Sequence, residues 1–313
     1  MVHTEVAARP CEASGVNESV FERFAARETS LGTLRILRAL PIRQKRLVGA
    51  WCFLDRFGPF SFSDAKPMDV APHPHIGLQT VSWLLNGEVV HNDSLGNEAL
   101  LRPGGVNVMT SGVGIAHAEE TPRENSGLLN GVQLWIALPE ADRNGQASFQ
   151  HIENVPIIEQ GGGVVSVFAG SMSGCSSPAK HFSQVLGADI ALHGLARLEL
   201  PLHPSFEHAA LLITGDAEIA GQSIDSKNLY YLGTNRSSVE FKTKEGCRVL
   251  LIGGPPFPEK ILMWWNFVAR TPEEIAQARA DWQSHRRFGE VKYQGPRLDA
   301  PSLKRFAPPN PAS

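Results

Sequence analysis

The chain has 313 residues and a formal net charge of −3, which is enough length for two ordinary domains with a real core. A pI near 6.4 indicates no binding to nucleic acid through bulk charge. Residues 1–20 lack the apolar segment of a signal peptide, and apolar runs are short throughout, so we expect a cytoplasmic protein without a transmembrane helix. The four cysteines have no C-x-x-C spacing and are interpreted as reduced thiols: Cys11, Cys52, Cys175 and Cys247.

Short strands separated by turns are the main pattern of the first half. The 29 glycines and 22 prolines of the chain interrupt short apolar runs, which is typical of strands rather than long helices. After a flexible tail over residues 1–20, Leu78–Leu85 is strand-like, and Asn86-Gly87 is a strong hairpin signal. Further short strands with turn signals between them predict an all-β sandwich or barrel of the jelly-roll kind over residues 21–150.

The second half, residues 151–313, repeats this pattern. A polar stretch over 139–150 and the run of glycines at 161–163 mark the boundary between the halves. Aligning Gly215 with Gly87 places three more residues of the second half on three of the first, namely His203 on His75, Glu207 on Gln79 and Pro201 on His73. The weak repeat predicts a duplicated barrel that has kept its shape and lost its ligands, and therefore binds no metal.

One helix is expected, near the C-terminus. Thr271-Pro272-Glu273-Glu274 combines an N-cap, a proline at the first helical position and a glutamate at the third. Ile275, Ala278 and Trp282 then share one face, so the prediction is a helix over 271–286, followed by an extended proline-rich tail.

Two pairs of ligand-type side chains stand out in the first half. Residues two apart on a strand point to the same face, so His73 and His75 point one way from one strand, and His117 and Glu119 from another. Either pair alone is found more often on the surface or in the packing of a loop than in a metal site. Together, if the two strands are neighbours in a barrel, they predict a site for one divalent first-row metal ion such as Fe, Mn, Co, Ni or Zn. Glu120 is the rival carboxylate, but it faces the opposite way from His117.

Two further polar residues are candidates to support the ligands. If the strand stays regular, Gln79, Val81 and Trp83 share the face of His75, and Gln79 could orient a ligand or a water. The alternative is an amide satisfied by neighbouring backbone. His91 is either a supporting or pocket-lining group or a residue on the strand surface.

These residues resemble those of the pirin family of bicupins. The resemblance rests on His73-Pro-His75 with Gly77, on the Asn86-Gly87 turn, on Pro103-Gly104 and on His117-Ala-Glu119. It extends to Trp51–Pro59, to Gly253–Pro258, to Met263–Val268 and to the predicted helix, so it covers nearly the whole chain after the tail. It implies two stacked cupin barrels, with a single Fe(II)-type site in the N-terminal one. Gln79 departs from the glutamate of many pirins, but the carboxylate ligand comes from the later His-x-Glu, so the implied site survives.

The function implied by the resemblance is Fe(II)-dependent dioxygenase activity of the quercetin 2,3-dioxygenase type, which opens a flavonol ring with O₂ and releases carbon monoxide. Glu119 is then the candidate catalytic base for the flavonol hydroxyl. The alternative is a non-enzymatic, redox-responsive regulator that binds a transcription factor or a metabolic enzyme. Because the sequence has no basic DNA-reading patch, such a regulator would act through a protein partner.

Overall fold

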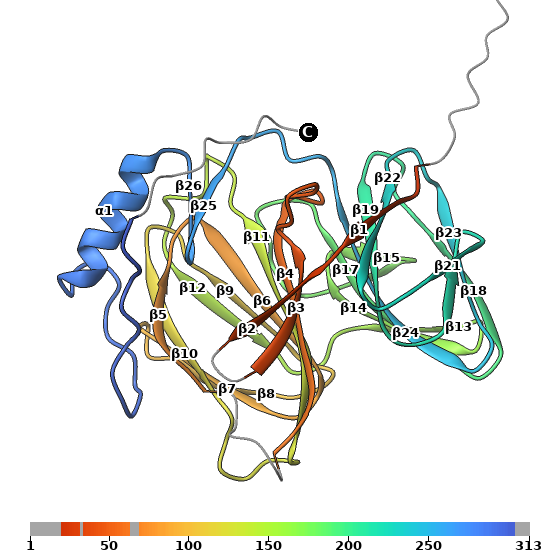
Figure 1. Ribbon diagram of the computed structural model, residues 1–313, viewed down its shortest axis with the longest axis horizontal. Coiled ribbons are helices and arrows are strands. Elements are labelled where there is room, and N and C mark those ends of the chain that lie inside the picture. Colours follow the sequence, from red (N-terminus) through yellow and green to blue (C-terminus); the bar gives the residue numbers. More distant parts are fainter. Residues whose placement is uncertain (1–19, 32–33, 63–68, 304–313) are drawn as a thin grey trace, which may run out of the picture.

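Two lobes of β-strands lie side by side in the computed structural model, with one helix on the outer side of the first lobe (Figure 1). The structure describes residues 20–31, 34–62 and 69–303, so the predicted tail, apart from Val20, lies outside the described residues. Within the described part, no helix has the length and apolarity needed to cross a membrane.

The first lobe is a barrel built from a seven-stranded and a four-stranded sheet. In spatial order, the larger sheet contains β12 Ser148–Ile152, β9 Val106–Thr110, β6 Leu78–Asn86, β11 Leu128–Ala137, β4 Trp51–Ser61, β3 Leu34–Leu40 and β2 Arg27–Leu31. The smaller sheet contains β5 Asp69–His75, β10 Ile115–Glu120, β7 Val89–Asp93 and β8 Glu98–Leu101.

The second lobe has the same two sheets in the same arrangement. Its larger sheet contains β1 Glu22–Ala25, β22 Asn228–Gly233, β19 Glu207–Gly215, β24 Gly246–Gly254, β17 Leu186–His193, β14 Gly163–Ala169 and β13 Ile157–Gln160. Its smaller sheet contains β18 Ala196–Pro201, β23 Ser238–Thr243, β20 Ala217–Ile219 and β21 Gln222–Ile224. A short hairpin, β15 Ser171–Met172 with β16 Cys175–Ser176, completes it. The prediction of two stacked jelly-roll barrels is confirmed.

The predicted internal repeat corresponds to equivalent strands of the two barrels. β6 and β19 are the third strands of their sheets, and each is followed or ended by a glycine with positive φ, Gly87 at +88° and Gly215 at +82°. Both strands are almost continuously buried, because each has one face in its own barrel and the other against the opposite barrel. This is why their sequences are apolar runs rather than alternating patterns.

Strand pairing differs from the predicted division at residues 21 and 150. β1 comes early in the chain but pairs with β22, so residues 22–25 extend the sheet of the second lobe. β12 spans residue 150 and pairs with β9 in the first lobe. The second barrel therefore has an edge strand, β1, that a division by chain order does not anticipate. The boundary at 150 itself stays a prediction.

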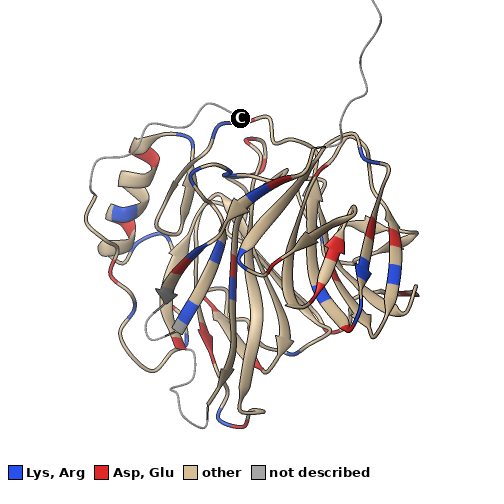
Figure 2. Ribbon diagram, turned by 45° about the vertical axis from the view of Figure 1, so that its right-hand side comes forward, with Lys and Arg blue, Asp and Glu red and all other residues tan. Residues whose placement is uncertain are grey.

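The barrels meet through a mixed apolar and polar interface. The indole Nε1 of Trp83 donates to Asp189 Oδ2 at 2.8 Å, and Arg248 forms an ion pair with the same carboxylate. Trp51 Nε1 from the first barrel donates to backbone carbonyls of Leu186 and Gly253 in the second. Figure 2 shows acidic and basic residues interspersed over the ribbon rather than separated by sign.

After β24 the chain returns to the first barrel. The hairpin of β25 Leu262–Trp264 and β26 Phe267–Ala269 leads into helix α1 Pro272–Gln283, which has the predicted capping box at Thr271 and Glu274. The predicted helix ran to residue 286, but it ends at Ser284, because His285 and Arg287 adopt positive φ. We call residues 255–303 the C-terminal extension.

Candidate metal centre

The two strands that carry the predicted ligand pairs are neighbours. β5 and β10 pair antiparallel, with His117 opposite His73 and Ile115 opposite His75. The register shifts between His117 and Glu119, because β5 holds one extra residue there. Residues directly opposite each other in a sheet point to the same face, so the three histidines share the inner face of the barrel.

Backbone carbonyls orient the histidines of β5. Nδ1 of His73 lies 2.9 Å from the carbonyl oxygen of Ala71, and Nδ1 of His75 lies 3.1 Å from that of Asn266. A carbonyl can only accept, so each Nδ1 carries the hydrogen and each Nε2 keeps a free lone pair.

A longer chain of hydrogen bonds orients His117. Its Nδ1 lies 3.3 Å from Nδ1 of His91, and Nε2 of His91 lies 3.2 Å from Asp93 Oδ2. Burial would raise the pKa of Asp93, but hydrogen bonds from His91 and Asn97 outweigh it and hold the pKa below its usual value. When the His91 ring carries one hydrogen, it donates from Nε2 to this carboxylate and accepts at Nδ1. His117 therefore donates from Nδ1, and its Nε2 also keeps a lone pair.

The three histidines thus present unprotonated nitrogens to one point. One nitrogen from each lies within 4.8 Å of the others, and Nε2 of His75 is 3.1 Å from Nε2 of His117. Neither of these two atoms has a hydrogen to share. Two nitrogens that bind one ion at about 2.1 Å lie about 3.0–3.4 Å apart in octahedral to tetrahedral geometry, so the observed spacing fits a metal ion between them.

Burial keeps the cluster in the form that binds metal. It lowers the pKa of His73 to about 4, and together with mutual repulsion it lowers the pKa values of His75 and His117 well below their usual value. All three imidazoles are therefore neutral near neutral pH, as ligation requires. The donor set suits a divalent first-row metal.

Glu119 lies beside this cluster but outside the group of three. It is 8% exposed, and Ser82 Oγ lies 3.2 Å from its Oε1 and 2.8 Å from Gln133 Oε1. A hydroxyl has one hydrogen for these two oxygens, so both contacts are satisfied when Glu119 is protonated or when the Gln133 amide presents its nitrogen. Burial raises the pKa of Glu119.

A cavity of about 400 Å³ opens onto the histidines, a volume within the range of small-molecule sites. Phe53 and Trp135 stack in its lining with ring centroids 4.0 Å apart. Its lining residues come from strands of the first barrel and from the C-terminal extension: Ile36, Arg38, Phe53, Asp55, Phe57, Val70, His73, His75, His117, Glu119, Gln133, Trp135, Trp265, Asn266 and Leu298.

Gln79 does not join this site, whereas His91 does. The Gln79 amide donates to Thr110 Oγ1 and to the carbonyl of Lys180, and accepts from His181. The expected strand parity does not carry across Gly77, which has φ +68° and separates β5 from β6. As a result Thr80 and Ser82, rather than Gln79 and Val81, lie opposite the cavity-lining Trp135 and Gln133.

Several contributors to the site have no signal in the sequence. Asn266 acts through its backbone carbonyl, 191 residues from His75, and Ser82 is visible only once the parity of β6 is known. Asp93 could have been noticed, because it stands two residues after His91 and so shares its face.

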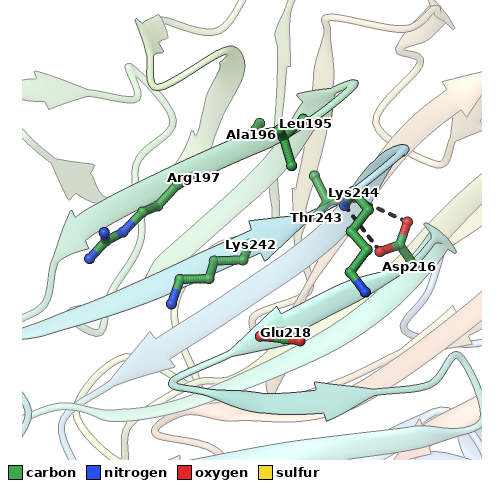
Figure 3. Close-up of a pocket in the computed structure, with 8 residues that line it drawn as sticks. All are labelled: Leu195, Ala196, Arg197, Asp216, Glu218, Lys242, Thr243 and Lys244. Atoms are coloured by element: carbon green, nitrogen blue, oxygen red, sulfur yellow. Dashed lines mark hydrogen bonds between the residues drawn. The ribbon is translucent and has the colours of Figure 1, made fainter.

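The second barrel has a different kind of pocket, shown in Figure 3. It has a volume of about 360 Å³ and contains no histidine. Two carboxylates, Asp216 and Glu218, line it. Asp216 accepts hydrogen bonds from Thr243 Oγ1 and from the backbone nitrogen of Lys244. The pocket is lined by Leu195, Ala196, Arg197, Asp216, Glu218, Lys242, Thr243 and Lys244. That this barrel holds no metal stays a prediction.

Comparison with known families identifies both barrels. The family model described as Pirin matches residues 33–136, and the model described as Pirin C-terminal cupin domain matches residues 187–289. A Pseudomonas aeruginosa protein named "Putative quercetin 2,3-dioxygenase PA1205" is 42% identical over 291 residues, which cover 92% of each chain.

Solved structures of two bacterial proteins resemble this chain. A crystal structure of a quercetin 2,3-dioxygenase from Acinetobacter baumannii is 41% identical with a TM-score of 0.89, covering 92% of this chain and 97% of that one. A bacterial pirin from Escherichia coli in complex with nickel(II) has a TM-score of 0.60 at 17% identity, covering 76% of this chain and 100% of that one. The second likeness shows the fold alone.

Proposed function

Because this chain belongs to the pirin family of two-barrel cupins, we propose that it is a metal-dependent dioxygenase of the quercetin 2,3-dioxygenase type. The proposed substrate is a flavonol. Both atoms of O₂ enter the ring-opened ester, and the ring carbon that bears the hydroxyl leaves as carbon monoxide with its own oxygen. The names of the Pseudomonas and Acinetobacter relatives support this reaction class. The proposed metal ligands are His73, His75, His117 and Glu119.

The observation that carries the proposal is the set of inward-facing, unprotonated nitrogens. Nε2 of His75 and Nε2 of His117 face each other at 3.1 Å with no hydrogen between them, and a cation relieves this contact. We propose Fe(II) as the ion, although the Escherichia coli relative holds nickel(II). A bound divalent ion supplies an open coordination position and withdraws charge from a substrate oxygen.

The protein's own groups would bind and deprotonate the substrate. Glu119 is the proposed base for the flavonol hydroxyl, and its raised pKa brings it closer to the range of an effective base. Phe53 and Trp135, which stack on each other, give the cavity an aromatic wall against which a planar ring would pack. Because the histidines are buried, the reacting oxygen would lie in a cavity with little bulk water.

Oxygen uptake on addition of quercetin to the iron-loaded protein tests the proposal, with carbon monoxide measured alongside. We expect uptake in the wild-type protein and none in His117→Ala, which removes a ligand. Glu119→Gln should retain most of the iron and lose turnover, because the amide cannot accept the proton.

Turnover in Glu119→Gln at the wild-type rate would contradict the role given to this residue. No uptake by wild-type protein with one iron bound per chain would contradict the dioxygenase. That result would favour the redox-responsive regulator. A pull-down of protein partners with the Fe(II) and the Fe(III) forms would then test this alternative.

A further inference from the structure

The C-terminal extension covers one side of the metal-binding barrel. Trp282 of α1 and Phe288 belong to one buried apolar cluster with Ala116, which lies on β10 next to the ligand His117. In Figure 1 the helix and the segment after it run alongside β5 and β10, on the side away from the second barrel. The outer face of the ligand-bearing sheet is therefore packed against a segment that follows the second barrel in the chain.

The extension also lines the cavity in front of the metal ligands, through Trp265, Asn266 and Leu298. Trp265 and Asn266 form the two-residue turn between β25 and β26, in which Trp264 pairs with Phe267. This turn is fixed to β5 at two points. His75 Nδ1 donates to the carbonyl of Asn266 at 3.1 Å, and the backbone nitrogen of Val268 donates to the carbonyl of Ile76 at 3.0 Å.

Trp265 has a backbone conformation that its side chain disfavours. Its φ is +51°, a region that tight hairpins normally fill with glycine, asparagine or aspartate. Strain of this kind persists where the surroundings impose it, and it concentrates at functional sites. The surroundings here are the two hydrogen bonds that fix the hairpin and the fully buried Phe267, whose ring centroid lies 5.5 Å from that of Trp265.

The rest of the cavity lining adds apolar side chains beside the histidines, namely Ile36, Phe53, Phe57, Val70 and Trp135. Phe53 and Trp135 are stacked at an interplanar angle of 13°. The one guanidinium in the lining, that of Arg38, lies over the Phe53 ring and is bound by both oxygens of Asp55 at 2.7 and 2.8 Å. Its charge is thus already neutralised within the protein, so it offers little to an anionic ligand.

We propose that Trp265 is a specificity-determining residue, through which the C-terminal extension supplies an aromatic wall for the substrate of the metal site. The ring contacts the face or edge of a planar aromatic substrate, and the turn that carries it is held in place by the ligand His75. This inference rests on the proposed function, because it assigns a wall to the flavonol pocket.

Binding of 3-hydroxyflavone under anaerobic conditions tests this wall without turnover. The dissociation constant is measured from the fluorescence of the flavonol, using metal-loaded wild-type protein and the variants Trp265→Ala, Trp265→Phe and Trp264→Ala. Trp264 is the matched control, since it is the adjacent tryptophan of the same hairpin, is also partly buried, and is not among the residues that line the cavity. Metal content per chain is determined for every variant.

We expect Trp265→Ala to weaken binding about tenfold and Trp264→Ala about twofold or less, with the metal content unchanged. Trp265→Phe keeps a ring and should fall between wild type and Trp265→Ala, and it carries the test if the alanine variant does not fold. Wild-type affinity in the Trp265 variants, or an equal loss in Trp264→Ala, would overturn the inference alone. No binding of 3-hydroxyflavone by the wild-type protein would overturn the flavonol assignment and this inference with it.

Discussion

At the scale of single residues, the hydrogen bonds at the far side of each imidazole determine what the histidine cluster can bind. Carbonyls of Ala71 and Asn266 fix the tautomers of His73 and His75, and the path through His91 to Asp93 fixes that of His117. Such outer partners typically change metal affinity about 10- to 100-fold. These hydrogen bonds therefore orient the three imidazole rings without any contribution from a metal ion.

The residues of this cluster were largely predictable from sequence, whereas their supporting contacts were not. The period-2 spacing of His73 with His75 and of His117 with Glu119 gave the two pairs, because it survives in any regular strand, and the pairing of their strands was the added assumption. The carbonyl of Asn266 carries no sequence signal, since every residue has one. The placement of Gln79 could not be predicted, because it depended on the backbone turn at Gly77.

A buried histidine in the second barrel predicts a pH dependence of stability. His208 is fully buried. Burial lowers its pKa to about 4, and His203 adds to the effect. Because His208 takes up a proton only in the unfolded chain between the usual value of 6.5 and about 4, folding stability falls as pH falls through that window, by up to about 3 kcal/mol.

The variant His208→Leu removes this titration. In urea unfolding, we expect it to gain stability relative to wild type as the pH is lowered from about 7 to about 5. An equal difference between variant and wild type at both pH values would contradict the assignment.

At the scale of elements, strand parity predicts faces only within one strand. β5 and β6 belong to different sheets, and the turn between them resets which side chains point inward. The helix shows the opposite case. Its start was predictable, because the capping box at Thr271 and Glu274 is a local interaction, whereas its end depended on the positive φ of His285 and Arg287.

The turn at Gly77 also allows the C-terminal extension to approach β5. A Cβ atom on Gly77 would lie 2.1 Å from the carbonyl oxygen of Val268, in the strand that follows the Trp265 turn. Gly96 is a matched control, because it also has positive φ, +87°, but a Cβ atom there would meet nothing within 4 Å.

Gly77→Ala should therefore lower the free energy of unfolding more than Gly96→Ala does. We expect about 1 kcal/mol for Gly96→Ala, from backbone strain alone, and at least about 3 kcal/mol for Gly77→Ala, in which the backbone must also move. Urea unfolding of the two variants measures the difference. Equal losses of unfolding free energy would contradict a tight contact between Gly77 and the C-terminal extension.

At the scale of the whole molecule, the duplication was predictable and the crossing of β1 to the second barrel was not. The alignment of Gly215 with Gly87 identified two equivalent strands, β6 and β19. The pairing of β1 with β22 joins the start of the chain to the second barrel, and no local pattern in four residues of an edge strand specifies such a partner. The return of the C-terminal extension to the first barrel was likewise invisible in sequence.

Asp189 links the two barrels by hydrogen bonds. We therefore predict a large loss of folding stability when its carboxylate is removed. It is 2% exposed and accepts from Trp83 of the first barrel and Arg248 of the second. Asp189→Ala leaves the Arg248 charge without its partner, which should cost about 3–5 kcal/mol. Glu240→Ala, which breaks exposed ion pairs with Arg197 and Lys242, should cost about 1 kcal/mol or less. Similar losses in urea unfolding would contradict the structural role of Asp189.

The duplication also provides the most direct test of the metal centre, because the sequence alignment of the two barrels places His203 on His75. The measurement is the number of metal ions bound per chain after loading with Fe(II) under anaerobic conditions, in wild type, His75→Ala and His203→Ala. We predict one ion in the wild type and in His203→Ala, and none in His75→Ala. An ion retained by His75→Ala, or lost from His203→Ala, would contradict a metal centre formed by the histidines of the first barrel.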